Sequence, residues 1–329
     1  MTLANATPFA ALDVPMEDAR GREMVLVVVK GTFDQRGGVL DLQQPVWVAD
    51  VPWEPDADAS SVRWPSDVAV DKPGADVVVV GQARAATPVR HVDVTVQVGP
   101  RKAELRVHGP RRFCRGAEGI VPGQSAPFRA QTIRYEGAYG GTGDAVIERR
   151  NPIGLGVADD LASLVDAPAP TIAWRDDAFT VAGRAVEPAG LGAIAPHWMP
   201  RAGYAGTFDA AWETERMPLL PEDFDPRYTR CAHPRLQFET RLAPGTPFSV
   251  EGMTEAAPVR ATVPALDAVV EATFDDGARE NVGIEIDTMV IDLELEAFPE
   301  PRIIVVGRAA FPRGRGQRRL LALRVEAKP

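Results

Sequence analysis

Apolar and polar residues follow strand-like patterns in the first third of the chain. Residues 24–30, MVLVVVK, form a continuous apolar run rich in β-branched valines, and residues 76–81, DVVVVG, form a second one. Such runs suit strands that are covered on both faces. Residues 91–98, HVDVTVQV, alternate strictly, and residues 103–109, AELRVHG, resume the alternation after a Gly-Pro turn. The pattern predicts a β-hairpin between these two segments.

Strand-like patterns return in the last third of the chain. In residues 289–298, MVIDLELEAF, apolar positions alternate with acids. We expect the apolar residues on a buried face and the acids, among them Asp292, on a solvated face. Apolar runs at 302–307 and 319–327 follow, with a Gly-rich turn between them. The predicted fold class is therefore mainly β, with sandwich-like antiparallel β units at both chain ends.

The middle of the chain has a different composition, rich in Gly, Pro and aromatic residues. Residues 159–166 could form two helical turns. Residues 207–216, TFDAAWETER, suit a helix better, because Thr207 or Asp209 can cap its N-terminus and Pro218 ends it.

These changes in pattern divide the chain into three expected regions. The first is an N-terminal β unit at residues 1–125. The second is a loop-rich region at residues 126–240, with one or two short helices, packed on the β units. The third is a C-terminal β unit at residues 241–329.

The segment 218–237, PLLPEDFDPRYTRCAHPRLQ, holds four prolines and too many apolar residues for a free linker. We expect an ordered loop that buries Leu219, Leu220 and Phe224 against the β units. Asp223 and Asp225 fit two roles, a catalytic carboxylate pair or side chains that cap turns. We favour the capping role, because an Asp close to Pro bonds readily to its own backbone.

Composition and charge exclude several classes of protein. The chain has 329 residues, ordinary apolar content and a net charge of −10. An acidic protein lacks the basic footprint that nucleic-acid binding needs. The N-terminus does not resemble a signal peptide, and no apolar run is long enough to span a membrane. With two cysteines and no CxxC motif, we expect a cytoplasmic protein with reduced thiols.

The charges of the last third are segregated. Residues 267–300 hold eleven acids and one base, whereas residues 301–329 hold eight bases and one acid. The favoured interpretation is cross-strand pairing of opposite charges on a solvated sheet face. The alternative is an electrostatic docking face.

The residues offer little evidence for catalysis. Cys231 and His233 are adjacent in sequence, whereas catalytic dyads usually join distant segments, and a partnership of Cys231 with His197 would require two loops to meet. Four histidines and no HExxH motif argue against a metal. The Gly-rich stretch 135–145 is neither GxGxxG nor a Walker loop, so we expect no cofactor. Its glycines are expected to form tight turns that let the tyrosines pack.

A series of motifs resembles one uncharacterised-domain family of Gram-negative bacteria. It includes VVVKGTF, RWPSDVAVDKPGADVVVVG, IRYEGAYGG, ERRNPIGLG and WMPRAGYAGTFDAAWETERMPLLPEDFDPRYTR. The family-like positions are Lys30, Pro65, Ser66, Asp67, Lys72, Pro73, Tyr135, Glu136, Gly140, Gly141, Asn151, Pro152, Gly154, Trp198, Arg201, Gly206, Thr207, Asp209, Trp212, Pro218, Leu219, Leu220, Pro221, Asp223, Phe224 and Asp225. The stretch TRCAHPRLQ departs from the family pattern, so Cys231 and His233 are not expected to belong to its shared machinery.

The resemblance implies a function in protein assembly. Members of that family are commonly encoded beside PAAR-spike effectors of the type VI secretion system. They are regarded as adaptors or chaperones that stabilise an effector and help to load it onto the VgrG spike. The resemblance thus implies a non-enzymatic adaptor whose partners are a PAAR-domain effector and VgrG, with no nucleic acid and no membrane involved.

Two sets of residues carry this expectation. Large, stiff side chains in rigid loops are typical of interface hot spots, and the partner-binding candidates are Tyr135, Tyr139, Trp198, Arg201, Tyr204, Trp212 and Arg216. The structural motif comprises Asn151, Pro152, Leu219, Leu220, Pro221, Asp223, Phe224 and Asp225. The alternative functions are a hydrolase that uses loop carboxylates or Cys231, and a carbohydrate-binding β-sandwich that uses Trp and Asp.

Overall fold

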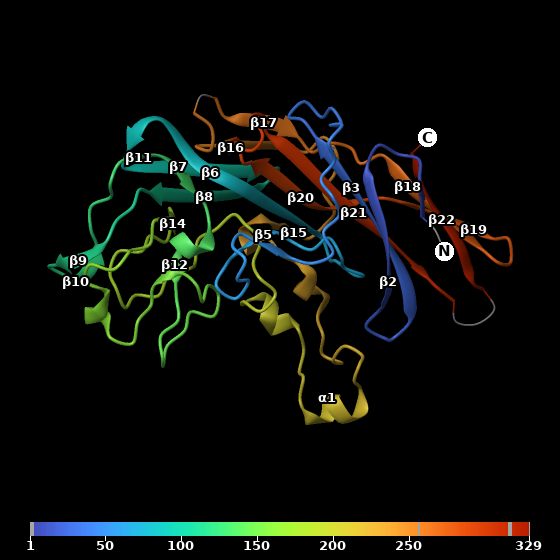
Figure 1. The fold of residues 1–329 in the computed structure, drawn as a ribbon, viewed down its shortest axis with the longest axis horizontal. Helices are drawn as coiled ribbons and strands as arrows, with labels where there is room; N and C mark the ends of the chain where they lie inside the picture. Colours follow the sequence, from blue (N-terminus) through green and yellow to red (C-terminus); the bar gives the residue numbers. More distant parts are fainter. Residues whose placement is uncertain (1–2, 256, 315–317, 329) are drawn as a thin grey trace.

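The computed structural model describes residues 3–255, 257–314 and 318–328, and it confirms a mainly β protein (Figure 1). Strands account for 42% of the chain and helices for 7%. The strands are β1 Leu3–Asn5, β2 Ala10–Glu17, β3 Glu23–Phe33, β4 Val51–Pro52, β5 Val62–Trp64, β6 Ala75–Val89, β7 His91–Val98, β8 Arg101–His108, β9 Phe113–Gly116, β10 Gly119–Pro122, β11 Phe128–Thr132, β12 Tyr139–Gly140, β13 Leu155–Gly156, β14 Ile172–Trp174, β15 Gln237–Phe238, β16 Pro247–Glu251, β17 Val259–Thr262, β18 Ala268–Phe274, β19 Arg279–Gly283, β20 Ile286–Leu293, β21 Arg302–Pro312 and β22 Leu320–Ala327.

Helices in the described residues are short. The α-helix α1 spans Ala210–Glu215, and the 3-10 helices are η1 Tyr135–Gly137, η2 Leu161–Leu164, η3 Arg201–Tyr204, η4 Pro226–Thr229 and η5 Pro234–Leu236. The helix expected at 207–216 is therefore present as α1, and Asp209 caps it. The segment expected to form two helical turns at 159–166 forms η2 only. None of the described helices is long and apolar enough to cross a membrane.

The largest sheet has the strand order β11-β6-β20-β21-β3-β2, with β15 also paired to β6. Strand β3 contains the MVLVVVK run, and its residues 25–33 are all buried, as expected for a strand covered on both faces. Strands β20 and β21 lie between β6 and β3, so a C-terminal hairpin separates two N-terminal strands. The largest sheet thus depends on both ends of the chain.

A five-stranded sheet, ordered β14-β8-β7-β16-β17, contains the predicted hairpin. Strands β7 and β8 pair in antiparallel register, with Val94 opposite Leu105. Val94, Val96 and Val98 are buried, which confirms the alternation. A four-stranded sheet, ordered β1-β22-β18-β19, joins the two ends of the chain, because β1 pairs in parallel with β22.

The expected β units at 1–125 and 241–329 share these sheets, so they do not stand apart as separate units. Each of the three large sheets contains strands from both segments, and in the largest one β20 and β21 lie between β6 and β3. One continuous apolar core also contains Val27, Trp198 and Ile291, one residue from each expected region. The composition boundaries mark changes of local structure, whereas the core is common to the whole chain.

The prediction of a solvated acidic face at residues 289–298 is wrong for Asp292, whereas Glu294 is half-buried and Glu296 is exposed. Strand β20 ends at Leu293, and all of its residues are buried because it lies inside the largest sheet. Asp292 is buried as well, and its Oδ2 accepts a hydrogen bond from Arg302 Nε at 2.8 Å. Alternation of apolar and charged residues is typical of a strand with one solvated face. A strand covered on both faces can show the same pattern when its buried charges form ion pairs.

The segregated charges do pair across strands. Arg302 binds Asp292, Arg308 binds Asp287, and Arg318 binds Asp276. The first two of these pairs are buried inside the protein and the third lies at its surface. The predicted Gly-rich turn before β22 includes residues 315–317, which lie outside the described residues.

Candidate functional site

Tyr135, Tyr139 and Trp198, three of the predicted partner-binding residues, are buried in the structure. Tyr135 packs edge-on against Trp198, with ring centroids 5.7 Å apart. Tyr139 stacks on Phe179 at 5.3 Å. These side chains belong to the core and offer no surface to a partner. The prediction that they bind a partner is therefore wrong.

Asn151 stabilises the Gly-rich turns around Tyr135 and Tyr139 by hydrogen bonds to their backbone. Its Nδ2 donates hydrogen bonds to the backbone oxygens of Tyr135 at 2.8 Å and Tyr139 at 3.0 Å. Gly140 has φ of 156°, and a Cβ there would lie only 2.1 Å from the Asn151 carbonyl oxygen. The turn therefore requires glycine, which agrees with the structural role predicted for this stretch. The adjacent Pro152 is half-buried and accepts a hydrogen bond from Thr142.

The remaining candidates lie in or beside a projecting segment, residues 205–225, which we call the arm. Figure 1 shows α1 at the end of the arm, away from the sheets. The arm leaves the body after η3 and returns at η4, and these two short helices pack together. Of the sequence-predicted residues, Trp212 and Arg216 lie in the arm, and Tyr204 immediately precedes it.

The base of the arm is held by backbone and cation–π contacts. The Asp225 N–H donates to the Tyr204 carbonyl at 3.0 Å. The Arg227 guanidinium lies 4.4 Å from the centroid of the Tyr204 ring. Arg201 is buried and donates to the carbonyls of Tyr228 at 3.0 Å and Ile194 at 2.5 Å. Arg201 thus fixes the arm to the body from inside, so its predicted contact with a partner is also corrected.

Trp212 organises the interior of the arm. Its indole N–H donates to the Leu219 carbonyl at 2.8 Å, and its ring packs edge-on against Phe208 at 4.7 Å. Asp209 caps α1 by accepting the Trp212 N–H at 2.9 Å. The Arg216 side chain donates to Leu220 within the arm and to the Ala19 carbonyl in the β2–β3 turn. The arm is therefore a folded unit that also contacts the β2–β3 turn.

The two acids of the EDFDP stretch have structural roles, but only Asp225 has the capping role that we favoured. Asp223 accepts hydrogen bonds from the Thr207 N–H at 2.9 Å and the Thr207 hydroxyl at 2.8 Å, joining the two sides of the arm. Asp225 caps η4 and pairs with Arg227. The bonds to Thr207 lower the pKa of Asp223, and those to Arg227 lower the pKa of Asp225. Both carboxylates are stabilised in the charged form, and neither is prepared to donate a proton at neutral pH.

The expected burial of the loop side chains is wrong for Leu220 and incomplete for its neighbours. Leu220 is exposed, whereas Leu219 and Phe224 are half-buried and only Pro221 is fully buried. Phe208 and Met217 are 55% and 60% exposed. The expectation assumed that the loop packs on the sheets, but the arm projects from them and buries its apolar residues mainly against each other.

The surface of the arm combines exposed apolar side chains with an excess of acids. Residues 205–225 contain six acids and one base, Arg216. A hollow of about 360 Å³ lies between Trp212, Leu219 and the acids Glu215 and Glu222. Such a surface fits a partner that has apolar side chains and basic residues.

Comparison with family models shows one match that includes the arm. Residues 20–308 match the model described as an uncharacterized protein conserved in bacteria, DUF2169. The chain belongs to the DUF2169 family. Comparison with curated proteins and with solved structures gave no match.

Several family-like residues of this DUF2169 chain form a buried ionic network that sequence analysis did not foresee. Lys30 on β3 binds Asp67 at 2.7 Å, and Lys72 binds Asp76 on β6 at 2.9 Å. Asp76 also accepts the Cys231 N–H at 2.7 Å. These bonds fasten the loop between β5 and β6 onto the largest sheet. The family-like lysines and acids are thus structural.

Cys231 lacks the features of a catalytic nucleophile. It is buried, and burial raises the pKa of its thiol to about 12. A reactive cysteine needs a lowered pKa. His233 is also buried, packs on Trp174 at 4.6 Å and caps η5, whereas His197 is exposed. Burial, and then the charge of Arg235, lower the pKa of His233 to about 3, despite the Glu187 carboxylate 3.5 Å from Nε2. The described part of the DUF2169 chain contains no group of three or more His, Cys, Asp or Glu side chains placed to hold a metal.

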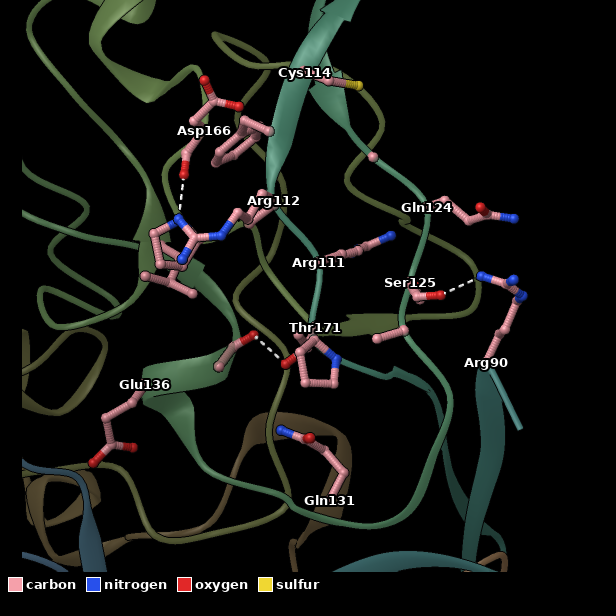
Figure 2. Close-up of a pocket in the computed structure, with 18 of the residues that line it drawn as sticks. Arg90, Arg111, Arg112, Cys114, Gln124, Ser125, Gln131, Glu136, Asp166 and Thr171 are labelled. Carbon is pink, nitrogen blue, oxygen red and sulfur yellow. Dashed lines mark hydrogen bonds between the residues drawn. The ribbon is translucent and has the colours of Figure 1, made fainter. Parts of the chain in front are cut away.

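Sequence reasoning missed a large cleft with arginines on its walls (Figure 2). The signal that could have indicated it is GPRRF, in which two adjacent arginines follow a Gly-Pro pair at the end of a strand. This segment lies outside the motifs that carry the family resemblance, and two adjacent arginines alone do not indicate a cleft.

Proposed function

We propose that this protein is a cytoplasmic adaptor that binds a PAAR-containing effector of the type VI secretion system. It stabilises the effector, in particular its N-terminal region, and helps to load it onto the VgrG spike. In this proposal the protein has no catalytic activity of its own. The observation that supports it is the projecting arm, with its exposed apolar side chains.

The arm has the physical properties of a binding element. Phe208, Met217 and Leu220 are exposed on it, and exposed apolar groups gain free energy when a partner covers them. The capping and indole bonds hold the arm in one shape, so little conformational entropy is lost when it binds. The acids of the arm select a basic partner surface and repel an acidic one.

The decisive experiment combines coexpression with a pull-down. A PAAR-effector gene from the same genome is expressed with and without this gene, and the soluble effector is measured. We expect more soluble effector with the adaptor, because covering an apolar surface removes a route to aggregation. Secretion of the effector is then measured in the native host, with and without this gene.

Matched variants test whether the arm is responsible. The double variant Met217→Ser and Leu220→Ser removes two exposed apolar side chains of the arm. We expect effector binding to weaken by about 2 kcal/mol or more, the usual threshold for an interface hot spot. Leu42→Ser is the control, because Leu42 is 69% exposed and lies far from the arm in the sequence. The melting temperatures of all three proteins should agree, since the altered side chains are exposed.

Two results would contradict the proposal. One is an effector level and secretion that stay intact when this gene is deleted. The other is turnover of a substrate by the purified protein that depends on Cys231 or Asp225, which would favour the hydrolase alternative.

A further inference from the structure

The arginine cleft, with Arg90, Arg111 and Arg112 on its walls, is a large open cavity beside β11. It has a volume of about 1060 Å³. Its walls come from the β8–β9 connection, the loop before β11, strand β11 and the segment 166–171 (Figure 2). This volume reaches the upper limit of typical small-molecule pockets, about 1,000 Å³, so it suits an extended ligand better than a compact one.

Three arginines on these walls are held by carbonyl groups instead of carboxylates. Arg90 Nη1 donates to the Ser125 carbonyl at 2.5 Å, and Arg111 Nε donates to the Pro170 carbonyl at 2.6 Å. Arg112 donates to the Asp166 carbonyl, and Figure 2 shows this bond beside that of Arg90. A carbonyl orients a guanidinium but leaves its charge uncompensated and its other donors free.

The neighbouring sheet shows what paired arginines look like in this protein. On β8 and after β14, Arg106 binds Asp93 at 2.7 Å and Arg175 binds Glu104 at 3.0 Å. For Arg90, Arg111 and Arg112, no carboxylate of the described residues lies within ion-pair distance. Two acids, Glu136 and Asp166, also border the cleft. Glu136 is engaged by the Ser61 N–H at 2.9 Å and hydroxyl at 2.7 Å, and Asp166 contacts Arg112 through its backbone carbonyl.

The charge of Arg111 carries an energetic cost that an anion would offset. Burial lowers the pKa of Arg111 to about 10, which still leaves the group charged at neutral pH. A half-buried cation without a counter-ion is destabilising, and a carboxylate placed beside it would recover part of that free energy. Because the whole protein has a net charge of −10, the cleft is a local positive region in an acidic molecule.

The same cleft is bordered by an edge strand. Strand β11 is the first strand of the largest sheet and pairs with β6 on one side only. Ala130, Gln131 and Thr132 of β11 line the cleft. An exposed edge strand offers backbone donors and acceptors to another strand, which is the basis of peptide recognition by strand addition.

We propose that this cleft binds an extended acidic segment of another polypeptide, which pairs with β11 and places its carboxylates on Arg90, Arg111 and Arg112. The site is separate from the arm, and it goes beyond the function proposed above. Alternate side chains of the bound strand point toward the arginines, so a segment that alternates acidic and apolar residues fits best.

The test is a titration of the purified full-length protein with a fluorescent peptide that alternates Glu and Val, followed by anisotropy. We expect saturable binding that weakens about tenfold for Arg111→Gln, the loss that follows from one charge-assisted hydrogen bond. Arg90→Gln and Arg112→Gln should each weaken binding as well. These two side chains are exposed, so they keep the test valid if Arg111→Gln fails to fold. Arg36→Gln is the charge-matched control, because Arg36 is exposed and does not line the cleft.

Three further measurements distinguish the proposed ligand from other anions. A peptide methylated on alternate backbone nitrogens should bind poorly, because strand pairing needs those N–H groups. Hydrogen exchange at residues 128–132 should slow when the unmodified peptide binds. Inorganic phosphate should not displace the peptide at a similar concentration.

Each of these measurements has a possible result that would overturn the proposal. Equal weakening by Arg36→Gln would reveal a non-specific charge effect. Undiminished binding of the methylated peptide would exclude strand addition. Displacement by equimolar phosphate would identify a site for small oxyanions, and an absence of saturable binding would remove the site altogether.

Discussion

Single polar residues in the middle of this protein act mainly on the main chain. Asn151, Asp223 and Arg201 each bond to backbone groups of two loop residues or bridge two loops. Loops lack the regular hydrogen bonds of sheets, so side chains must satisfy their backbone groups. This explains why residues that resemble catalytic or binding groups in the sequence instead stabilise loops by hydrogen bonds to the backbone. For Asp225 the turn chemistry was readable, whereas the burial of Tyr135 and Trp198 depends on contacts between distant segments.

His233 gives a prediction about acid stability at the residue scale. Its pKa is about 3 in the folded protein, against an ordinary value of 6.5. In the unfolded chain the imidazole takes up a proton near pH 6.5, whereas the folded one stays neutral until about pH 3. Protons therefore favour unfolding in this window, and stability falls as the pH drops through it, by up to about 1.4 kcal/mol per pH unit for one proton. His108, with a pKa of about 4, acts with the same sign.

Urea unfolding between pH 7 and pH 4 measures this dependence. His233→Asn should lower stability at pH 7, because it removes the packing on Trp174. It should also give a shallower loss toward acid, since Asn can cap η5 but does not titrate. His197→Asn is the control, because His197 is exposed, and its profile should match the wild type. An unchanged slope in His233→Asn would show that the proton is taken up elsewhere.

At the scale of the element, the arm is held largely by contacts between its own residues. The sequence predicted its helix and offered Asp209 as one of two possible caps, because a cap and its helix are local features spaced by three or four residues. It did not predict that the loop projects and leaves Leu220 exposed. An amphipathic segment can pack on a sheet or on itself, depending on whether the surface of the sheet is already covered. The sequence of the segment alone does not contain that information.

Loss of the helix cap should loosen the arm without unfolding the body. Asp209→Ala removes the bond to the Trp212 N–H, and such caps contribute about 1 kcal/mol. Hydrogen exchange across residues 207–223 should accelerate, while exchange in β3 and β6 stays unchanged. Asp209→Asn should retain slow exchange, because Asn caps equally well. Faster exchange throughout the protein would instead mean that the arm and the sheets unfold together.

At the scale of the whole molecule, three sheets share one core to which both ends of the chain contribute. The strand runs and the β7–β8 hairpin were predictable from period-two patterns. The strand order was not, because pairing between distant strands leaves no local mark on either one. The buried network of Lys30, Asp67, Lys72 and Asp76 was hidden for the same reason, since each charge is ordinary until the fold brings its partner to it.

Removing one member of that network should destabilise the entire protein. Lys72→Met leaves the buried Asp76 without its closest cation, which lies at 2.9 Å. Breaking a buried pair in this way costs about 3–5 kcal/mol. The midpoint of denaturant unfolding should fall accordingly. Lys102→Met, which removes a half-exposed lysine at the surface of β8, should change it by less than about 1 kcal/mol. A midpoint that falls equally in both variants would contradict the structural role of the network.

The insertion of β20 and β21 between β3 and β6 has a consequence for synthesis on the ribosome. The N-terminal strands emerge first, yet the strands that separate them are translated near the end of the gene. Until then the valine-rich edges of β3 and β6 have no native neighbour and can pair wrongly with each other or with other nascent chains. Such distant pairing also makes folding slow. A protein that we propose to stabilise another chain therefore passes through a stage, before its own translation ends, in which its own strand edges are open to wrong pairing.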